Sequence, residues 1–279
     1  MGIAQVAWPG RGDLDATAGL RSRNTQSHIW GAPWKGGFVQ QKLIVVIPAY
    51  NEDPVIASTI AGVRAQLSEP PLNDLPSHVI VIDDGSQDGT YQKAKQEGVT
   101  VLRHPSNRGL GAARRTGFEA ARHQEATLVV TFDADGQHSP RDLPQVLSPL
   151  LDDRADMTIG SRLLSANMIP LSRRVILWGA NLLTWLLFGV WTTDSQSGLR
   201  ALNRRALEQI ELRTDRMEVS SEIVAESKRL GLRMAEVPIE AIYTEYSRQK
   251  GQTFWDGFSV LYKLILRRAR CTVGSDEPD

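Results

Sequence analysis

The sequence contains a single cysteine in 279 residues, and its 32 basic side chains are balanced by 32 acidic ones. One cysteine excludes an intrachain disulfide framework and any metal site built from several thiolates. The zero formal net charge argues against a general nucleic-acid binder, which carries an excess or a stripe of basic residues. A reducing, cytosolic compartment fits a chain so poor in cysteine.

The first 41 residues contain no apolar run and show neither a helical nor a strand period. They are rich in Gly, Arg, Gln and Ser, so we expect residues 1–41 to be a disordered extension. The apolar core of a secretory signal is missing, and Val6 stands where N-terminal myristoylation requires Ser or Thr. We therefore expect neither export nor N-terminal acylation.

Short apolar runs alternate with stretches of helical character from Leu43 onward. This alternation is typical of an α/β fold in which helices cover both faces of a mostly parallel sheet. Ligands of such sheets bind beyond the carboxyl ends of the strands, so the residues after each strand are candidates for a site. The predicted strands lie at 43–47, 79–83, 99–103, 128–132, 157–161 and 233–239. The predicted helices lie at 55–67, 89–96, 109–122 and 143–151, with another within 217–231.

Two polar motifs follow the first two predicted strands. In PAYNE, Pro48 stops the strand ladder, Tyr50 offers a flat face to a base, and Glu52 offers an acceptor. In DDGSQDGT, the carboxylates of Asp83 and Asp84 suit the amino groups of a base or the hydroxyls of a ribose. Either motif alone is also compatible with plain turn chemistry. Together they indicate a nucleotide site.

The fourth predicted strand ends in DADGQH. Asp133 and Asp135 are two residues apart, so in extended backbone both carboxylates can face one side and share a divalent cation. Gln137 adds a neutral oxygen at the same period. Because all three are oxygen ligands, the pattern indicates Mg²⁺ or Mn²⁺ rather than Zn²⁺. We expect His138 to lie behind this site or at the surface.

A glycine-containing loop, NRGLGAARRTG at 107–117, follows the third predicted strand and opens a helix. A helix N-terminus can receive a phosphate group. The loop has neither the dinucleotide spacing GxGxxG nor the P-loop spacing GxxxxGK[ST]. We therefore favour the interpretation that Gly109 and Gly111 let the chain turn.

A long apolar stretch, RRVILWGANLLTWLLFGVW, occupies residues 173–191. It is compatible with an interfacial helix that presents Trp178, Trp185 and Trp191, with a buried core helix, or with a short membrane span, in that order of preference. Residues 255–270 add a basic amphipathic helix that can lie on an anionic membrane surface. We expect any membrane attachment to be peripheral.

In order along the chain, IPAYNE, VIDDGSQDGT, NRGLGAARRTG, FDADGQH, GSR and TDSQSGLRALNRRAL resemble glycosyltransferase family 2. Within that family they are most similar to the dolichyl-phosphate mannose synthase and polyprenyl-phosphate hexosyltransferase branch. The resemblance implies a GT-A fold, placed at residues 42–245, with inversion at the anomeric carbon. It also implies a nucleoside-diphosphate sugar donor and a divalent metal. Residues 246–279 would form a mobile basic loop, an amphipathic helix and an acidic tail.

The resemblance implies a role for individual residues of this sequence. It places Arg162, in GSR, beside the acceptor, and Ser197, Gly198 and Arg200 in the catalytic floor. At the metal it implies Asp133, Asp135 and Gln137, with Asp135 central to catalysis. Around the donor it implies Pro48, Tyr50, Glu52, Asp83, Asp84, Asp133 and Glu222.

The charge of the acceptor bears on which residues are needed. A lipid phosphate is already anionic, so it requires no strong general base, while arginines are required to hold it. The candidates are Arg162, Arg173, Arg174 and Arg200. An acceptor hydroxyl would instead require a base, and Asp194 is the best candidate for that role.

The sequence thus predicts an inverting, metal-dependent transfer of a hexose from a donor of the GDP-mannose or UDP-glucose type to a polyprenyl phosphate. The reaction would take place at the cytoplasmic face of a membrane. The main alternative is transfer to a sugar, small-molecule or protein hydroxyl with Asp194 as base. A nucleotidyltransferase or a non-catalytic nucleotide-sugar-binding protein is less favoured. The base, the sugar and the oligomeric state stay open.

Overall fold

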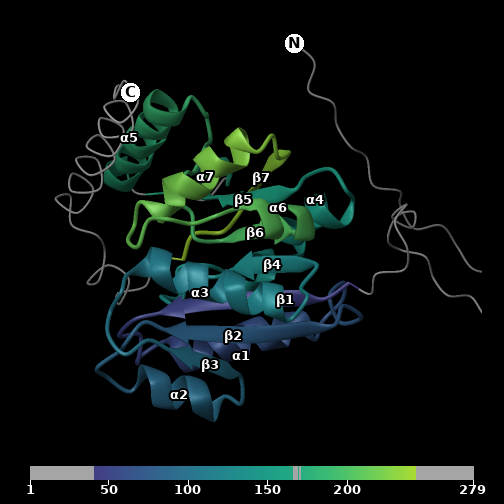
Figure 1. Ribbon diagram of the computed structural model, residues 1–279, viewed down its shortest axis with the longest axis vertical. Helices are drawn as coiled ribbons and strands as arrows, with labels where there is room; N and C mark the ends of the chain where they lie inside the picture. The colour runs from purple at the N-terminus through teal and green to yellow at the C-terminus, as the bar shows by residue number, and fades with distance from the viewer. Residues whose placement is uncertain (1–40, 166–168, 170, 243–279) are drawn as a thin grey trace, which may run out of the picture. The chain divides into compact units, whose positions relative to one another are not determined.

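The computed structural model describes residues 41–165, 169 and 171–242 (Figure 1). The predicted N-terminal extension, up to residue 40, lies outside the described residues. The same holds for the predicted basic loop, terminal helix and acidic tail.

Seven strands of the described region form one sheet in the order β3-β2-β1-β4-β6-β5-β7. Neighbouring strands are parallel except where β6 meets β4 and β5, to both of which it is antiparallel. The predicted mostly parallel α/β sheet is confirmed, and six of the seven strands lie where the sequence predicts them. The strands are β1 (Leu43–Ala49), β2 (Ser77–Asp83), β3 (Thr100–Arg103), β4 (Leu128–Thr131), β5 (Met157–Ser161), β6 (Arg200–Asn203) and β7 (Met234–Pro238).

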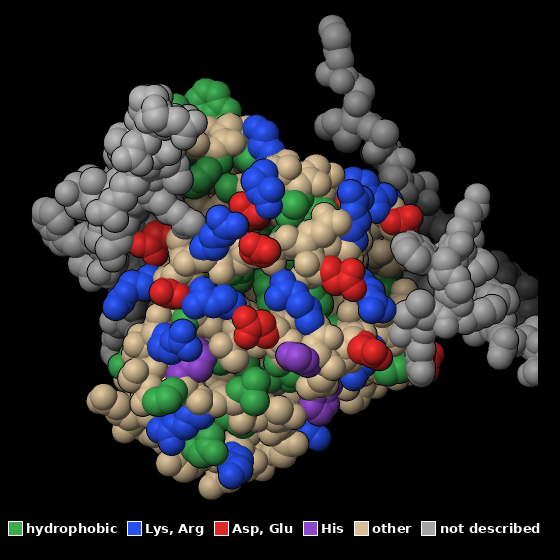
Figure 2. All heavy atoms as spheres, viewed as in Figure 1, with side chains coloured by type: hydrophobic (Ala, Val, Ile, Leu, Met, Phe, Trp, Pro, Cys, Tyr) green, Lys and Arg blue, Asp and Glu red, His purple; other side chains and the backbone are tan. Residues whose placement is uncertain are grey.

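Helices cover both faces of this sheet (Figure 1). Strand β1 shows why, because Leu43, Val45 and Ile47 enter one apolar cluster while Ile44 and Val46 enter the other. The first cluster includes residues of α1 (Ile56–Leu67), α2 (Thr90–Gln96) and α4 (Leu143–Leu151). The second includes residues of α3 (Leu110–His123), α6 (Arg204–Gln209) and α7 (Val219–Arg229). On the face seen in Figure 2, basic and acidic side chains are interspersed, in keeping with the balanced composition.

The strand order sets the position of a ligand crevice. The chain runs from β1 outward to β2 and β3, then returns to β4 on the opposite side of β1. A crevice at the carboxyl ends of the sheet is expected where the strand order reverses in this way. The PAYNE motif spans the end of β1, and the DADGQH motif follows β4. The fold therefore brings the two motifs to the same edge.

Strand β6 was not predicted, and its direction matters for the site. Because β6 is antiparallel to β4, it begins at the edge where β4 ends, with Arg200 in register with Thr131. The hydroxyl of Thr131 donates to the carbonyl oxygen of Gly198 at 2.7 Å. The SGLR motif thus lies beside DADGQH, although the bonded residues Thr131 and Gly198 are 67 positions apart in the sequence.

Helix α5 (Leu171–Phe188) carries an unusual distribution of side chains. Trp178 and Trp185 are exposed, whereas Asn181 and Thr184 are buried. Trp191, just after the helix, is also exposed. No helix in the described part of the chain has the length and apolar character needed to cross a membrane. Helix α5 is therefore buried on one side only, and its placement at a membrane interface stays a prediction.

Candidate active site

The loops after β1 and β2 are joined by hydrogen bonds at the predicted nucleotide site. The backbone N–H of Asn51, whose φ is 53°, donates to Ser86 Oγ, and Asn51 Oδ1 accepts from the N–H of Gln87. The backbone N–H of Glu52 donates to Thr90 Oγ1 at 2.7 Å. These contacts fix the loops relative to each other and leave the ring of Tyr50 37% exposed. The prediction that Pro48 stops the strand ladder is wrong, because Pro48 lies in register with Ile82 and β1 continues to Ala49.

Asp83 ends β2 with a fully buried carboxylate. Arg103, at the end of β3, places its Nε 3.0 Å from Asp83 Oδ2. The same guanidinium donates to the carbonyl of Ser86 and lies 4.6 Å from the centre of the Tyr91 ring. The sequence interpretation missed Arg103, because a basic residue at the end of a short, half-buried strand gives no local signal. The contact with Asp83 links it to the predicted nucleotide site.

Asp84 binds protein groups. Its carboxylate accepts hydrogen bonds from the backbone N–H groups of Arg108 and Gly109, and it lies 2.7 Å from Nδ1 of His104. The backbone carbonyl of Asp215 also caps the N-terminus of α3, because it accepts a hydrogen bond from the N–H of Gly111 at 2.8 Å. A β-carbon at either Gly109 or Gly111 would overlap the backbone at 214–215. The glycines therefore allow close packing, and the helix terminus is already occupied by protein acceptors.

Asp133 and Asp135 follow β4 as predicted, but their carboxylates lie in different electrostatic surroundings. Although burial acts in the opposite direction, a hydrogen bond from His138 and the charge of Arg114 hold the pKa of Asp133 well below its ordinary value. Burial, followed by the nearby charge of Asp133, raises the pKa of Asp135. Neighbouring groups of the protein thus stabilise the negative charge of Asp133, whereas the negative charge of Asp135 is less well compensated.

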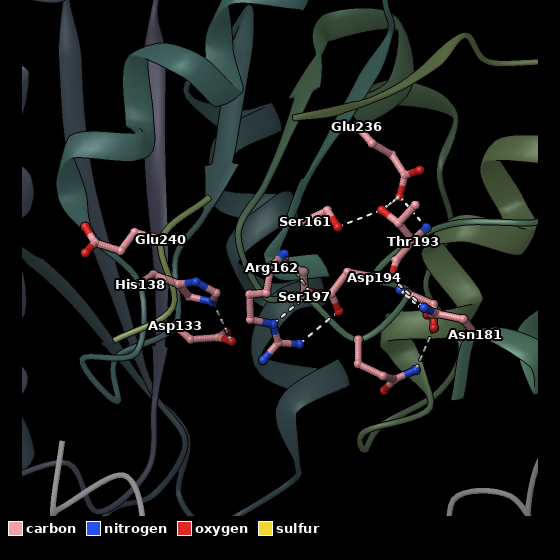
Figure 3. Close-up of polar contacts among 12 residues, drawn as sticks. Asp133, His138, Ser161, Arg162, Asn181, Thr193, Asp194, Ser197, Glu236 and Glu240 are labelled. Atoms are coloured by element: carbon pink, nitrogen blue, oxygen red, sulfur yellow. Dashed lines mark hydrogen bonds and ion pairs between the residues drawn. The ribbon is translucent and has the colours of Figure 1, made fainter. Parts of the chain in front are cut away.

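Three groups fix the carboxylate of Asp133. Arg114 Nη2 donates to Asp133 Oδ1 at 3.2 Å, and His138 Nε2 lies 3.5 Å from Oδ2 (Figure 3). Gly198 closes the third side, since a β-carbon there would overlap both carboxylate oxygens. Arg114 was missed from the sequence because it stands in a helix among Ala and Gly, yet its side chain is only 1% exposed. His138 is buried and therefore does not lie at the surface, while its place behind a bound metal stays a prediction.

The residues present fit a hard divalent cation. Within the described residues, no group of three or more His, Cys, Asp or Glu is placed to hold a metal by itself. Two neighbouring carboxylates, of which Asp135 keeps an under-compensated negative charge, suit Mg²⁺ or Mn²⁺, which usually keep several ligands from water and substrate phosphates. Gln137 donates its backbone N–H to Asp135 Oδ1 at 3.0 Å, which holds that carboxylate in the loop. Side-chain ligation by Gln137 stays a prediction.

Arg162 and Asp194 form a bidentate ion pair at the centre of the site (Figure 3). Arg162 Nε lies 2.7 Å from Oδ2 and Nη2 lies 2.9 Å from Oδ1, and the backbone N–H of Arg162 also donates to Oδ2. Asp194 is fully buried, whereas the side chain of Arg162 keeps 15% of its surface exposed. Burial and the charge of Asp133 raise the pKa of Asp135, and the positive charge of Arg162 offsets part of that rise.

Ser197 and Arg200 follow Asp194 in the chain, and the charge of Asp194 reaches Arg200. The guanidinium of Arg200 is fully buried and donates to the carbonyl oxygens of Ser195, Ser197 and Ser220. Burial, reinforced by the positive charge of Arg114, lowers the pKa of Arg200 to about 9. It therefore stays charged at neutral pH and supports the loop with hydrogen bonds. The hydroxyl of Ser197 is buried without a hydrogen-bond partner among the described residues.

The remaining predicted site residues are dispersed. Glu222 is buried on α7, and its carboxylate accepts from the backbone N–H groups of Arg213 and Thr214. Arg174 is exposed in the first turn of α5. The side chain of Arg173 lies outside the described atoms. Ligand contacts of these three residues stay predictions.

Comparison with known proteins identifies the family. The model described as Glycosyl transferase family 2 matches residues 44–211, more than half of the chain. The chain belongs to glycosyltransferase family 2. The family resemblance, the enzyme class and the GT-A type of fold expected from the sequence are thereby confirmed.

Individual relatives of this glycosyltransferase agree. The UDP-N-acetylglucosamine–dolichyl-phosphate N-acetylglucosaminyltransferase of Methanococcus voltae is 36% identical over 248 residues, covering 81% of this chain and 96% of that protein. The undecaprenyl-phosphate mannosyltransferase of Micrococcus luteus is 32% identical over 222 residues, covering 75% and 87%.

A solved structure supports the fold assignment. Glucosyl-3-phosphoglycerate synthase from Mycobacterium tuberculosis, in complex with Mn²⁺, UDP and phosphoglyceric acid, matches with a TM-score of 0.60 and 22% identity. The match covers 86% of this chain and 80% of that one. The candidate site of this glycosyltransferase therefore lies on a sheet of the GT-A type. It unites PAYNE, DDGS, DADGQH, Arg162, Asp194 and the SGLR motif.

Proposed function

We propose that this glycosyltransferase moves a hexose or N-acetylhexosamine from a nucleoside-diphosphate sugar to a polyprenyl phosphate, with inversion at the anomeric carbon. Its relatives from Methanococcus voltae and Micrococcus luteus are named for dolichyl-phosphate and undecaprenyl-phosphate substrates. One name specifies an N-acetylglucosamine donor and the other a mannosyl transfer, so the sugar is left open.

The donor would occupy the crevice between the ends of β1, β2 and β4. Tyr50 and Asp83 would contact the base, with Arg103 holding the Asp83 carboxylate in place. Asp133, Asp135 and Gln137 would hold a Mg²⁺ or Mn²⁺ ion. When bound, this ion would neutralise the diphosphate and stabilise it as a leaving group.

The Arg162–Asp194 ion pair is the observation that carries the choice of acceptor. Asp194 is the best base for a hydroxyl acceptor, but both of its oxygens accept hydrogen bonds from Arg162. Both oxygens are therefore already engaged by protein donors, which places Asp194 to orient Arg162. Arg162 in turn is partly exposed and oriented by the pair, which suits it to hold an anionic phosphate.

The chemical step then requires no proton transfer. A phosphate oxygen attacks the anomeric carbon, the bond from that carbon to the diphosphate oxygen breaks, and the diphosphate leaves with the electron pair. Arg162 orients the attacking phosphate. The fixed charges of Arg114 and Arg200 offset the negative charge gathered at the site.

We further propose that α5 rests on the membrane that holds the acceptor, on its cytoplasmic face. Trp178 and Trp185 are 55% and 46% exposed, and Val175 and Leu186 add apolar surface. Exposed aromatic and aliphatic side chains of this kind partition into the interface between water and lipid. The segment 246–279 is proposed to add a basic loop and a second interfacial helix.

The proposal is tested by incubating the protein with Mn²⁺ and a panel of radiolabelled GDP-sugars and UDP-sugars, with and without polyprenyl phosphate. Label that enters organic solvent only when the lipid is present supports the proposal and names the donor. The Asp135→Ala variant serves as the control for catalysis. Donor turnover without lipid-linked label would overturn the proposal in favour of another acceptor.

A further inference from the structure

Asn181 holds the backbone on both sides of Asp194. Its Nδ2 donates to the carbonyl oxygen of Thr193, and its Oδ1 accepts from the N–H of Ser195 at 2.8 Å. Only one orientation of the amide satisfies both contacts, because one is to an acceptor and the other to a donor. Figure 3 shows Asn181 beside the loop that carries Asp194.

The position of Asn181 in its helix is as informative as its contacts. It is only 2% exposed and lies on α5, the helix whose tryptophans face outward. A buried amide costs free energy unless both of its polar groups are paired, as they are here. The amide therefore joins α5 to the loop at residues 193–195.

We propose that Asn181 is a positioning residue that ties α5 to the Arg162–Asp194 pair. Asp194 can orient Arg162 only while its own backbone is fixed, and Asn181 fixes the residue before it and the residue after it. The position of α5 is thereby transmitted to the guanidinium that faces the acceptor. This inference rests on the proposed role of Arg162 in acceptor binding.

Other contacts hold the same loop from the opposite side. Glu236 Oε1 accepts from the N–H of Thr193 at 2.7 Å, and Arg200 donates to the carbonyl of Ser195. These anchors come from strands of the sheet. Without Asn181 the loop should therefore stay folded, but its position relative to α5 should no longer be fixed.

The test is a double-mutant cycle of Asn181→Leu, which is close to isosteric, and Asp194→Asn. Asn181→Leu should lower kcat/KM for the acceptor by about tenfold to a hundredfold, as misplacement of a catalytic group does, with donor affinity unchanged. If Asn181 acts through Asp194, the double variant should be no slower than Asp194→Asn alone. Effects that multiply in the cycle, or a parallel loss of donor affinity, would overturn the inference.

Thr184→Val provides the matched control. Thr184 lies one turn further along α5, is 1% exposed, and directs its hydroxyl to Ala180 and Ser221. The Thr184→Val variant should lower the thermal midpoint of unfolding about as much as Asn181→Leu does and leave the acceptor kinetics unchanged. An equal kinetic loss in both variants would mean that Asn181 only stabilises the helix.

A readout independent of the acceptor separates this inference from the proposed function. The side-chain Nε–H resonance of Arg162, assigned with the Arg162→Lys variant, reports the ion pair without any substrate. Asn181→Leu should shift or broaden it, and Thr184→Val should not. An unchanged resonance in Asn181→Leu would overturn the inference, whereas absence of lipid-linked product in the wild type would overturn the proposed function alone.

Discussion

Gly198 lies directly against the carboxylate of Asp133. A β-carbon built at Gly198 would overlap both oxygens of that carboxylate. The SGLR motif thus needs a glycine at this position for a steric reason, because only a residue without a β-carbon lets β6 begin beside the loop that carries Asp133. The glycine also fixes the direction in which Asp133 points.

Adding one methyl group at this position should displace the Asp133 carboxylate. We expect Gly198→Ala to lower kcat by about a hundredfold, since small displacements of catalytic groups have effects of that size. The fold should survive, because the obstructed atoms are the end of a side chain that can rotate away. Gly179→Ala is the matched control, as a β-carbon there meets nothing within 4 Å. Equal kinetics in the two variants would contradict the steric account.

Neutralising Asp135 should separate activity from stability. Because the pKa of Asp135 is raised by burial and by Asp133, its charged form is disfavoured in the folded state. Asp135→Asn should therefore abolish turnover while the thermal midpoint stays equal or rises. The measurement pairs thermal unfolding in metal-free buffer with the radiolabel assay. A clear loss of stability would show that the carboxylate is compensated within the protein.

Glu222→Gln tests whether this residue serves the donor or the fold. The Glu222 carboxylate binds the backbone at Arg213 and Thr214, and the following residue, Asp215, caps α3. Loss of a charged acceptor should cost roughly 1 to 3 kcal/mol of unfolding free energy. Chemical denaturation measures that loss. Unchanged stability with a raised KM for the donor would instead support the contact with the donor sugar predicted from the sequence.

Asp156 provides a prediction remote from the site. It is 1% exposed and, although burial opposes the shift, hydrogen bonds from Arg233 and Asn203 lower its pKa to about 2. The folded-state pKa is depressed, so the stabilisation is complete above the unfolded-state value near 4 and is lost as the pH falls toward 2. That stabilisation amounts to about 2 kcal/mol. Asp156→Asn should accordingly be less stable than wild type at pH 7 and nearly equal to it at pH 2, as measured by denaturant titration at both values.

The strands that the sequence predicted share one physical feature. Runs such as Leu43–Ala49 are apolar at every position because helices cover both faces of the sheet, and polar motifs mark where they end. Strand β6 lacks that signal, since it begins with the buried Arg200 and ends with Asn203. Its antiparallel direction follows from long-range pairing with β4 that no local pattern encodes.

The residues of the site also divide into those that the sequence locates and those that it does not. Asp133, Asp135 and Arg162 could be located from motifs, because their spacing relative to strands is local. Arg114 could not, since its partner Asp133 is 19 residues away and its neighbours read as an ordinary helix. The pairing of Arg162 with Asp194 could not be predicted from the sequence either, although it determines which role the Asp194 carboxylate can take.

The choice between a phosphate and a hydroxyl acceptor is tested most directly by offering both on the same lipid. Polyprenyl phosphate and the corresponding polyprenol are compared at equal concentration with the donor identified by the radiolabel panel. An acceptor held by Arg162 as an anion predicts lipid-linked product from the phosphate and none from the alcohol. Comparable product from the alcohol, lost in Asp194→Asn, would contradict the account and assign Asp194 the role of general base.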